Sequence, residues 1–275
     1  MATLSVVTIT LNEERKIERC LRSVSWADEK IVVDSFSRDR TVERARELGA
    51  RVIQHEYPGS TRQMERGIGV ACGDWILFLD ADEEVSPELG VEIRKMLAEG
   101  TGCTAFEIPR KPWAFGRWLE HGGWFPDWQC RLLRRDSYTV NHAEVHGGFS
   151  TGGPRGRLGG GRAVVFHYTY ENIFAYVARM NEYTSLEVAN RLARHPEAQA
   201  RWYNMMLSPL SHFLRMFLVR GGYRDGMHGF VLSLLDAVYA MLLYAKLWEY
   251  RRAQREGMPT PPITNRELNV LKRQE

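Results

Sequence analysis

The sequence predicts an α/β protein with a mostly parallel sheet flanked by helices, followed by a helical C-terminal appendage. Two observations carry this prediction: strands and helices alternate at short spacing over the first ~100 residues, and the strands are almost continuously apolar. The length of 275 residues is enough for one large α/β domain plus an appendage. We expect the α/β domain over residues 1–170, with halves at 1–100 and 101–170, and the helical region over 171–275.

The first half alternates strands with helices. Residues 4–11 (LSVVTITL) and 75–79 (WILFL) are apolar runs of the kind found in strands covered on both faces of a sheet. Helical periodicity follows each of the first three strands, and glycines end two of the helices. The predicted strands are 4–11, 30–34, 51–55 and 75–79, and the predicted helices are 13–23, 40–48 and 62–71.

The second half is less regular. The glycine-rich stretch 147–161 predicts a flexible or turn-rich loop. Residues 171–194 have the periodicity of a long helix. The other predicted elements are a helix over 87–99 and strands over 104–110, 131–134 and 163–168.

Composition excludes several classes of protein. Hydrophobic residues make up 44% of the chain and charged residues 26%, so a sizeable core can form. The net charge of +3 gives no global signal for nucleic-acid binding. Cys20, Cys72, Cys103 and Cys130 form no close-spaced pair, so we expect a reducing cytosol and neither a zinc site nor a disulfide framework. The first three residues lead straight into a strand without a basic region, which does not fit a secretory signal.

Two apolar stretches, 205–219 and 230–248, lie near the C-terminus. A membrane-spanning helix needs ~20 mostly apolar residues, and Asp236 and Lys246 interrupt the second stretch. Because basic residues outnumber acidic ones between 201 and 255, we expect helices that lie in the membrane interface, on an anionic surface. This predicts a cytoplasmic protein held peripherally at the inner face of the cytoplasmic membrane. A soluble helical subdomain, a dimer interface and a spanning helix are the alternatives.

An acidic turn, Asp80-Ala81-Asp82-Glu83, follows the apolar run at 75–79. In an extended segment, alternation would point the carboxylates of Asp80 and Asp82 to one side. Two such oxygen ligands suit Mg²⁺ or Mn²⁺ bridging to a diphosphate. The alternative is a surface run of acids favoured by the dipole of the helix that follows, because a motif this short is common.

Polar residues also end two neighbouring strands, at Asn12-Glu13 and at Asp34-Ser35. Sheets of this kind bind ligands at the carboxyl ends of their strands. Asp34 is placed to accept a hydrogen bond from a base N–H or a ribose hydroxyl. Arg62 is placed to reach a base carbonyl or a diphosphate, unless it is a solvated arginine on a helix face.

Three segments carry a family resemblance: residues 10–13 (TLNE), 34–41 (DSFSRDRT) and 73–83 (GDWILFLDADE). In order, spacing and strand context they resemble the inverting family-2 glycosyltransferases of the GT-A fold. Later segments are similar to one subgroup, the lipopolysaccharide inner-core glycosyltransferases that add glucose to heptose. These segments are 121–124 (HGGW), 127–135 (DWQCRLLRR) and 221–226 (GGYRDG).

The resemblance implies transfer of a sugar from a UDP-sugar to the lipopolysaccharide inner core, with Mg²⁺ or Mn²⁺ as cofactor. By the subgroup, the sugar is glucose and the acceptor is heptose. Residues 1–100 would hold the donor and residues 101–170 the acceptor, and Asp82, with Asp80, would ligate the metal. The implied nucleotide-sugar contacts are Thr10, Leu11, Asn12, Glu13, Asp34, Ser35, Ser37, Arg62, Asp80, Ala81 and Asp82. The implied acceptor or diphosphate contacts are Gln129, Arg131, His146 and His167.

An inverting transfer needs one base that deprotonates the acceptor hydroxyl. Asp127 is the first candidate, because it lies in an aromatic neighbourhood and because its spacing to Gln129 and Arg131 resembles the family pattern. The alternatives are Glu144, His146 and His121. Related enzymes often have a Val-His-Glu segment, whereas here His146 precedes Gly147, which leaves the catalytic role of that segment open.

Other functions are compatible with parts of this pattern. A nucleotidyltransferase also uses a metal-bound acidic pair, but residues 11–16 lack the glycine-rich loop that grips a triphosphate. A non-catalytic sugar-nucleotide-binding protein and transfer to another lipid-linked or polysaccharide acceptor are further alternatives. No G-x-G-x-x-G fingerprint occurs in the first turn, which argues against a dinucleotide oxidoreductase.

Overall fold

The structure, a computed structural model, describes residues 2–141 and 148–263. The chain divides into two compact units, which we call the sheet unit and the helical unit. The sheet unit comprises Met1–Trp113 and Pro126–Thr169, and the helical unit comprises Ala114–Phe125 and Tyr170–Glu275. The predicted division of function near residue 170 stays a prediction. By contacts alone, the segment Ala114–Phe125 groups with the C-terminal helices.

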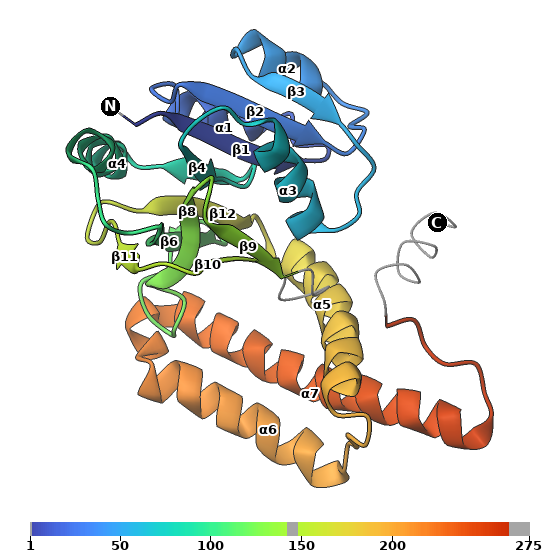
Figure 1. Ribbon diagram of the computed structural model, residues 1–275. Helices are drawn as coiled ribbons and strands as arrows, with labels where there is room; N and C mark the ends of the chain where they lie inside the picture. Colours follow the sequence, from blue (N-terminus) through green and yellow to red (C-terminus); the bar gives the residue numbers. More distant parts are fainter. Residues whose placement is uncertain (1, 142–147, 264–275) are drawn as a thin grey trace. The chain divides into compact units, whose positions relative to one another are not determined.

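A mixed sheet forms the centre of the sheet unit (Figure 1). Among the described residues its strands follow the order β3-β2-β1-β4-β8-β6-β12-β5, with β1 parallel to both β2 and β4, and β8 antiparallel to β4. The strands are β1 (Leu4–Thr10), β2 (Glu29–Asp34), β3 (Arg51–Gln54), β4 (Trp75–Phe78), β5 (Glu83–Val85), β6 (Ala105–Ala114), β8 (Asp127–Arg134), β11 (Arg155–Arg157) and β12 (Val165–Tyr170). The prediction of a mostly parallel sheet flanked by helices is confirmed.

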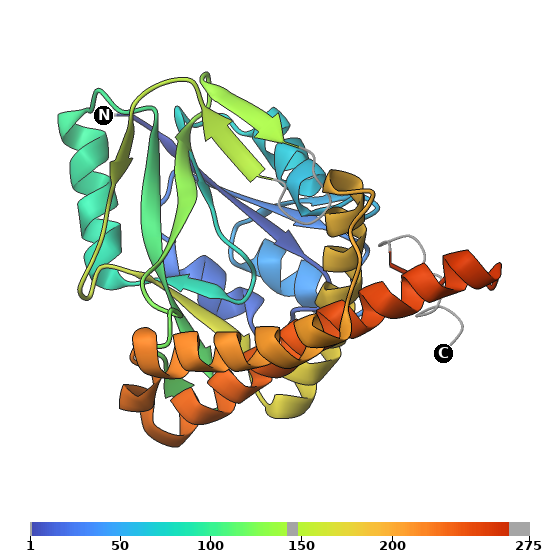
Figure 2. The same cartoon turned by 90° about the horizontal axis from the view of Figure 1, so that it is seen from below.

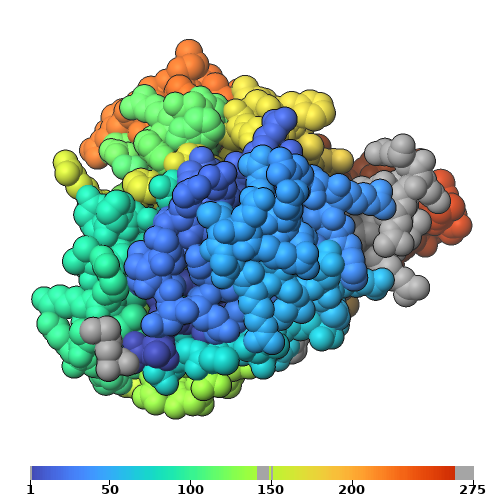
Figure 3. Space-filling view, turned by 90° about the horizontal axis from the view of Figure 1, so that it is seen from above, coloured from blue at the N-terminus to red at the C-terminus, as the bar shows by residue number. Residues whose placement is uncertain are grey.

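Helices cover both faces of this sheet. They are α1 (Ile17–Ser23), α2 (Thr41–Glu47), α3 (Ser60–Val70) and α4 (Pro87–Glu99). Val6 and Leu77 pack in one core cluster with α1 and α4, while Val7 and Ile76 pack in another with α3. Alternate residues of one strand therefore enter different cores, which explains why the strands are apolar at nearly every position. Figure 3 shows the outer surface that the N-terminal third of the chain contributes.

Helix α3 lies unusually close to the sheet. A Cβ atom placed on Gly67 would lie 2.3 Å from Cγ1 of Val7 on β1. Only glycine permits that approach, because a larger residue would overlap the strand. Arg62 lies in the first turn of the same helix.

The glycine-rich stretch is more ordered than predicted. It contains β10 (Gly148–Thr151), which pairs with β9 (Tyr138–Asn141), and β11, which pairs with β6. The ring of Phe149 stacks on that of Phe78 with centroids 4.5 Å apart. A Cβ on Gly156 would lie 2.6 Å from Cε1 of Phe106. The prediction of a flexible loop was wrong for these segments, because glycine there allows close strand packing.

The helical unit consists of α5 (Ile173–Arg194), α6 (Trp202–Leu214), a π-helical turn η1 (Arg215–Val219), a 3₁₀ turn η2 (Gly222–Asp225) and α7 (Gly226–Glu256), with the short strand β7 (Arg117–Trp118). Helices α6 and α7 run side by side (Figure 2). Asp236 on α7 pairs with His212 on α6 at 2.9 Å, and Nζ of Lys246 donates to Thr184 and Ser185 on α5. Both charges that interrupt the apolar stretch therefore have partners within this unit.

Among the described residues, one helical stretch, Gly222–Glu256, is long and apolar enough to cross a membrane. Length and composition alone make this weak support for a spanning helix, because core helices of soluble proteins pass the same test. Leu232 and Leu247 on α7 are almost fully buried in two core clusters of the unit.

Candidate active site

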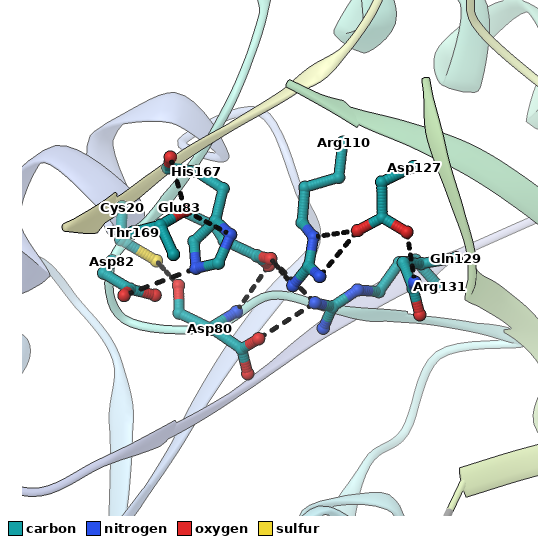
Figure 4. Close-up of polar contacts among 10 residues, drawn as sticks. All are labelled: Cys20, Asp80, Asp82, Glu83, Arg110, Asp127, Gln129, Arg131, His167 and Thr169. Atoms are coloured by element: carbon teal, nitrogen blue, oxygen red, sulfur yellow. Dashed lines mark hydrogen bonds and ion pairs between the residues drawn. The ribbon is translucent and has the colours of Figure 1, made fainter. Parts of the chain in front are cut away.

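The acidic turn begins where β4 ends. The carbonyl of Asp80 accepts a hydrogen bond from the N–H of Glu83 at 2.9 Å, so the backbone turns between the two aspartates. Oδ2 of Asp80 lies 2.9 Å from Nη2 of Arg131, whereas Oδ2 of Asp82 lies 3.5 Å from Nε2 of His167 (Figure 4). The expectation of an extended segment was wrong, because residues 81–82 form a turn. Because the chain turns, the two carboxylates have different partners.

Glu83 lies beneath this turn and is fully buried. Its Oε2 accepts a hydrogen bond from the N–H of Asp80 at 2.9 Å. Its Oε1 lies 2.7 Å from Nη2 of Arg131 and 3.3 Å from Nη1 of Arg110. Desolvation raises the pKa of the Glu83 carboxyl, and the charge of Arg131 acts against that rise. Glu83 thus anchors the turn from inside the core.

Asp127 and Gln129 alternate along β8 and so share one face of the strand, whereas Arg131 lies at an irregularity in the pairing of β8 with β6. Oδ2 of Asp127 accepts hydrogen bonds from Nε and Nη2 of Arg110, at 2.9 and 2.6 Å. Oδ1 of Asp127 accepts one from Nε2 of Gln129 at 2.6 Å. Arg110 and Asp127 lie opposite each other in the register of β6 and β8. The pairing of these strands therefore orients the carboxylate.

His167 lies on β12, opposite Glu83 on β5. Its Nδ1 lies 3.0 Å from the hydroxyl of Thr169, so its Nε2 faces Asp82. Both side chains are mostly buried, with 12% of His167 and 16% of Asp82 exposed. A carboxylate oxygen and an imidazole nitrogen this close fit one divalent cation that takes its remaining ligands from a substrate diphosphate. Within the described residues, no group of three or more potential ligands forms a site made of protein alone.

The two loops that follow β1 and β2 are joined by hydrogen bonds. Asp34 is fully buried, and its carboxylate accepts hydrogen bonds from the N–H and hydroxyl of Ser37 and from Nε2 of Gln54. The N–H of Asn12 donates to the hydroxyl of Ser37 at 2.8 Å. The N–H of Ser35 donates to the carbonyl of Thr10 at 2.9 Å. Asp34 therefore holds the loop that contains Ser37, and a direct contact with a nucleotide stays a prediction.

The outer side of these loops is open. Leu11 and Phe36 are about half exposed, at 50% and 53%. The N–H of Glu13 donates to Oγ1 of Thr41 at 2.8 Å, and Arg62 is exposed. Thr10 and Ala81, by contrast, are buried. The predicted nucleotide contacts thus divide into buried residues that shape the loops and exposed residues that line them.

Six of the predicted site residues come together in or beside one hydrogen-bonded network. It contains Asp80, Asp127, Gln129 and Arg131, with Asp82 and His167 at its edge. Sequence reasoning missed Arg110 and Gln63; Nε2 of Gln63 donates to Ser35. No short motif marks either residue, because their roles arise from strand pairing and helix packing. Glu144 and His146 lie outside the described residues.

Two of the later subgroup segments, 121–124 and 221–226, form a corner of the helical unit. Oδ2 of Asp225 accepts hydrogen bonds from the N–H groups of His121 and Glu120, and its Oδ1 lies 2.9 Å from Nδ1 of His121. Desolvation raises the pKa of Asp225, but these hydrogen bonds outweigh it and lower the pKa. A Cβ on Gly123 would lie 2.4 Å from Nη1 of Arg220. The HGGW and GGYRDG segments therefore pack onto each other, and His121 has a structural partner there.

Fold and site together define a glycosyltransferase of the GT-A fold. The chain belongs to glycosyl transferase family 2, whose family model matches residues 5–151. The lipopolysaccharide core biosynthesis glycosyltransferase LpsC of Rhizobium meliloti is 26% identical over 258 residues, which cover 90% of this chain and 92% of that protein. The uncharacterized glycosyltransferase RT0209 of Rickettsia typhi is 30% identical over 259 residues, which cover 90% and 88%.

Among solved structures, a glucosyl-3-phosphoglycerate synthase from Mycobacterium tuberculosis in complex with Mn²⁺, UDP-glucose and phosphoglyceric acid is 32% identical. The match covers 42% of this chain and 45% of that chain, with a TM-score of 0.34.

Proposed function

We propose that the protein is an inverting hexosyltransferase that moves a sugar, glucose, from a UDP-sugar to a heptose of the lipopolysaccharide inner core. The observation that carries this proposal is the network of the sheet unit, in which the acidic turn and the candidate base Asp127 are joined through Arg131, Glu83 and Arg110. Such a network would place the groups that bind a leaving diphosphate on one side and the base that deprotonates an attacking hydroxyl on the other. Similarity to LpsC supports the choice of acceptor.

On the leaving-group side, Asp82 and His167 are the residues that would hold Mg²⁺ or Mn²⁺. When bound, the cation offsets the negative charge that develops on the departing nucleoside diphosphate. Asp80 would contact the ribose or diphosphate, and Arg131 holds the Asp80 carboxylate in place at 2.9 Å. Thr169 keeps Nε2 of His167 turned toward Asp82.

On the acceptor side, Asp127 would take the proton from the acceptor hydroxyl as that hydroxyl attacks the anomeric carbon. A single displacement of this kind inverts the anomeric configuration. The two hydrogen bonds from Arg110 and the one from Gln129 fix the plane of the carboxylate before the acceptor arrives. Gln129 would also contact the acceptor. Glu144 and His146 remain the alternative bases.

The nucleotide would bind over the loops after β1 and β2. Asn12, Glu13 and Ser37 would contact the uridine, and Arg62 would reach the base or the diphosphate. The exposed side chain of Leu11 supports access of a nucleotide to this edge. Asp34 and Ser35 would act chiefly by holding the loops in shape.

We also propose that the exposed face of α6 and η1 lies on an anionic lipid surface. Exposed apolar side chains recur at intervals of four residues along this face: Trp202, Met206, Leu210, Leu214 and Leu218. Residues 201–224 contain four arginines and no carboxylate, so the charge around this apolar row suits anionic headgroups. Such a surface would bring the enzyme to a lipid-linked acceptor at the inner face of the cytoplasmic membrane.

A donor panel tests the proposed donor. Thermal unfolding is followed with UDP-glucose, UDP-galactose, UDP-GlcNAc and GDP-mannose, each with and without Mn²⁺. We expect a UDP-sugar, with UDP-glucose first, to raise Tm most and only in the presence of Mn²⁺, because a ligand that binds only the folded state stabilises it. A larger shift with GDP-mannose would contradict the donor assignment, and a metal-independent shift would contradict the role of the cation.

A further inference from the structure

Glu83 is the point at which the two sides of the site meet. One oxygen, Oε1, lies within 2.7 Å of Nη2 of Arg131 and 3.3 Å of Nη1 of Arg110. Arg131 also donates a hydrogen bond to Asp80 on the acidic turn, and Arg110 donates one to Asp127 on β8. A continuous chain of charged groups therefore runs from the acidic turn to the candidate base, with the buried Glu83 at its centre (Figure 4).

We propose that Glu83 is a positioning residue that holds the leaving-group side and the base side of the site in a fixed relation. This inference rests on the proposed function of the site. Without the charge of Glu83, the guanidinium groups of Arg110 and Arg131 would lie close together in the protein interior with no anion between them. Arg110 would then turn further toward Asp127 or toward solvent, and Arg131 would depend on Asp80 alone.

The burial of Glu83 supports a positioning role over a stabilising one. Burying three charges costs several kcal/mol of desolvation each, and well-packed apolar residues often give equal or greater stability. A buried ionic cluster of this kind fixes the direction of the groups at its ends. Here one end is the carboxylate of Asp80 and the other is that of Asp127, which must be placed to within about 0.5 Å for an efficient reaction.

The neighbouring residue Glu84 provides a matched control. It follows Glu83 in β5, and its carboxylate accepts a hydrogen bond from the hydroxyl of Tyr168 at 3.1 Å. Nε of Arg19 lies 3.7 Å from its carboxylate, and within the part of the chain that the structure describes no hydrogen bond or ion pair joins Glu84 to Arg110 or Arg131. Glu84→Gln removes the same charge at the next position along the strand without touching the proposed link.

The first test compares kcat and KM for Glu83→Gln and Glu84→Gln. Glutamine keeps the size of Glu83 and removes its charge. We expect Glu83→Gln to lower kcat by about tenfold or more while the donor KM changes less than about threefold, because the transition state and not the ground state depends on the alignment. Glu84→Gln should keep kcat within about twofold of the wild type. A kcat for Glu83→Gln equal to that of Glu84→Gln would overturn the proposal.

A double-mutant cycle separates positioning from general loss of structure. If Glu83 acts on Asp127 through Arg110, Glu83→Gln combined with Arg110→Gln should have a kcat no lower than the worse single variant. Multiplicative losses would show independent roles and overturn the proposal. If Glu83→Gln does not fold, Glu83→Asp replaces it in both tests, because the shorter side chain keeps the charge but withdraws it from Arg110; a normal kcat in that variant would equally overturn the proposal.

The failure of this inference can be told from failure of the proposed function. If the wild-type protein transfers no sugar from any donor in the panel, the proposed function fails. If the wild type is active and Glu83→Gln is as active as Glu84→Gln, only the positioning role fails.

Discussion

Nε2 of His167 on β12 lies 3.5 Å from Oδ2 of Asp82, although the two residues are far apart in the sequence. The N–H of Tyr168 donates to the carbonyl of Asp82 at 3.0 Å, so β12 follows the acidic turn closely enough to bring the imidazole to it. His167 thus brings a second potential metal ligand next to Asp82, from a strand outside the acidic turn.

Replacing His167 should mainly lower the apparent affinity of the enzyme for Mn²⁺. His167→Ala removes one of two proposed protein ligands, so we expect the Mn²⁺ concentration for half-maximal activity to rise at least about tenfold. The measurement is the rate of UDP release as Mn²⁺ is titrated. Thr169→Val should shift the same midpoint less, because it only loosens the imidazole. An unchanged midpoint for His167→Ala would remove His167 from the metal site.

Replacing the candidate base should separate chemistry from binding. Asp127→Asn keeps the size of the side chain but cannot accept the proton, so we expect kcat to fall by about 10²–10⁴-fold. Calorimetric titration should give a UDP-sugar affinity close to that of the wild type. Near-normal turnover in this variant would make Glu144 or His146 the leading candidate for the base.

The proposed lipid surface predicts a charge effect on membrane binding. Leu210→Glu places a negative charge in the exposed apolar row of α6, so co-sedimentation with phosphatidylglycerol vesicles should fall well below that of the wild type. Val91→Glu is the control, because Val91 is an exposed apolar residue on α4, outside this row. Equal sedimentation of the two variants would argue against a lipid surface at α6. A wild-type dimer that Leu210→Glu dissociates would show a second copy as the occupant instead.

The contact of α3 with β1 predicts opposite effects at two glycines of the same helix. Gly67→Ala forces a methyl group against Val7, and we expect it to lower the free energy of unfolding by about 1–3 kcal/mol. Gly69→Ala meets no atom within 4 Å and should raise it by up to about 1 kcal/mol through helix propensity. Denaturant unfolding of both variants measures the difference. Equal stability of the two variants would mean that α3 does not pack as described.

The sequence allowed the sheet and the acidic turn to be predicted, because both depend on local patterns. The apolar run of β1 indicates burial on two faces, and Asp80 lies two residues after the end of β4. The partner of Asp127 could not be predicted in this way. Arg110 reaches it only because β6 pairs with β8 in a particular register, and that register is a long-range property. The separate partners of Asp80 and Asp82 depend on a turn that alternation does not foresee.

We expect sugar transfer by this protein to depend on the acidic turn. The most direct measurement is release of UDP from UDP-glucose with Mn²⁺ and a core oligosaccharide that ends in heptose, with mass analysis of the product. We predict that the wild type releases one UDP for each hexose added to the oligosaccharide, and that Asp82→Ala folds normally but releases none. Hexose transfer by Asp82→Ala at the wild-type rate would contradict the proposed role of the acidic turn.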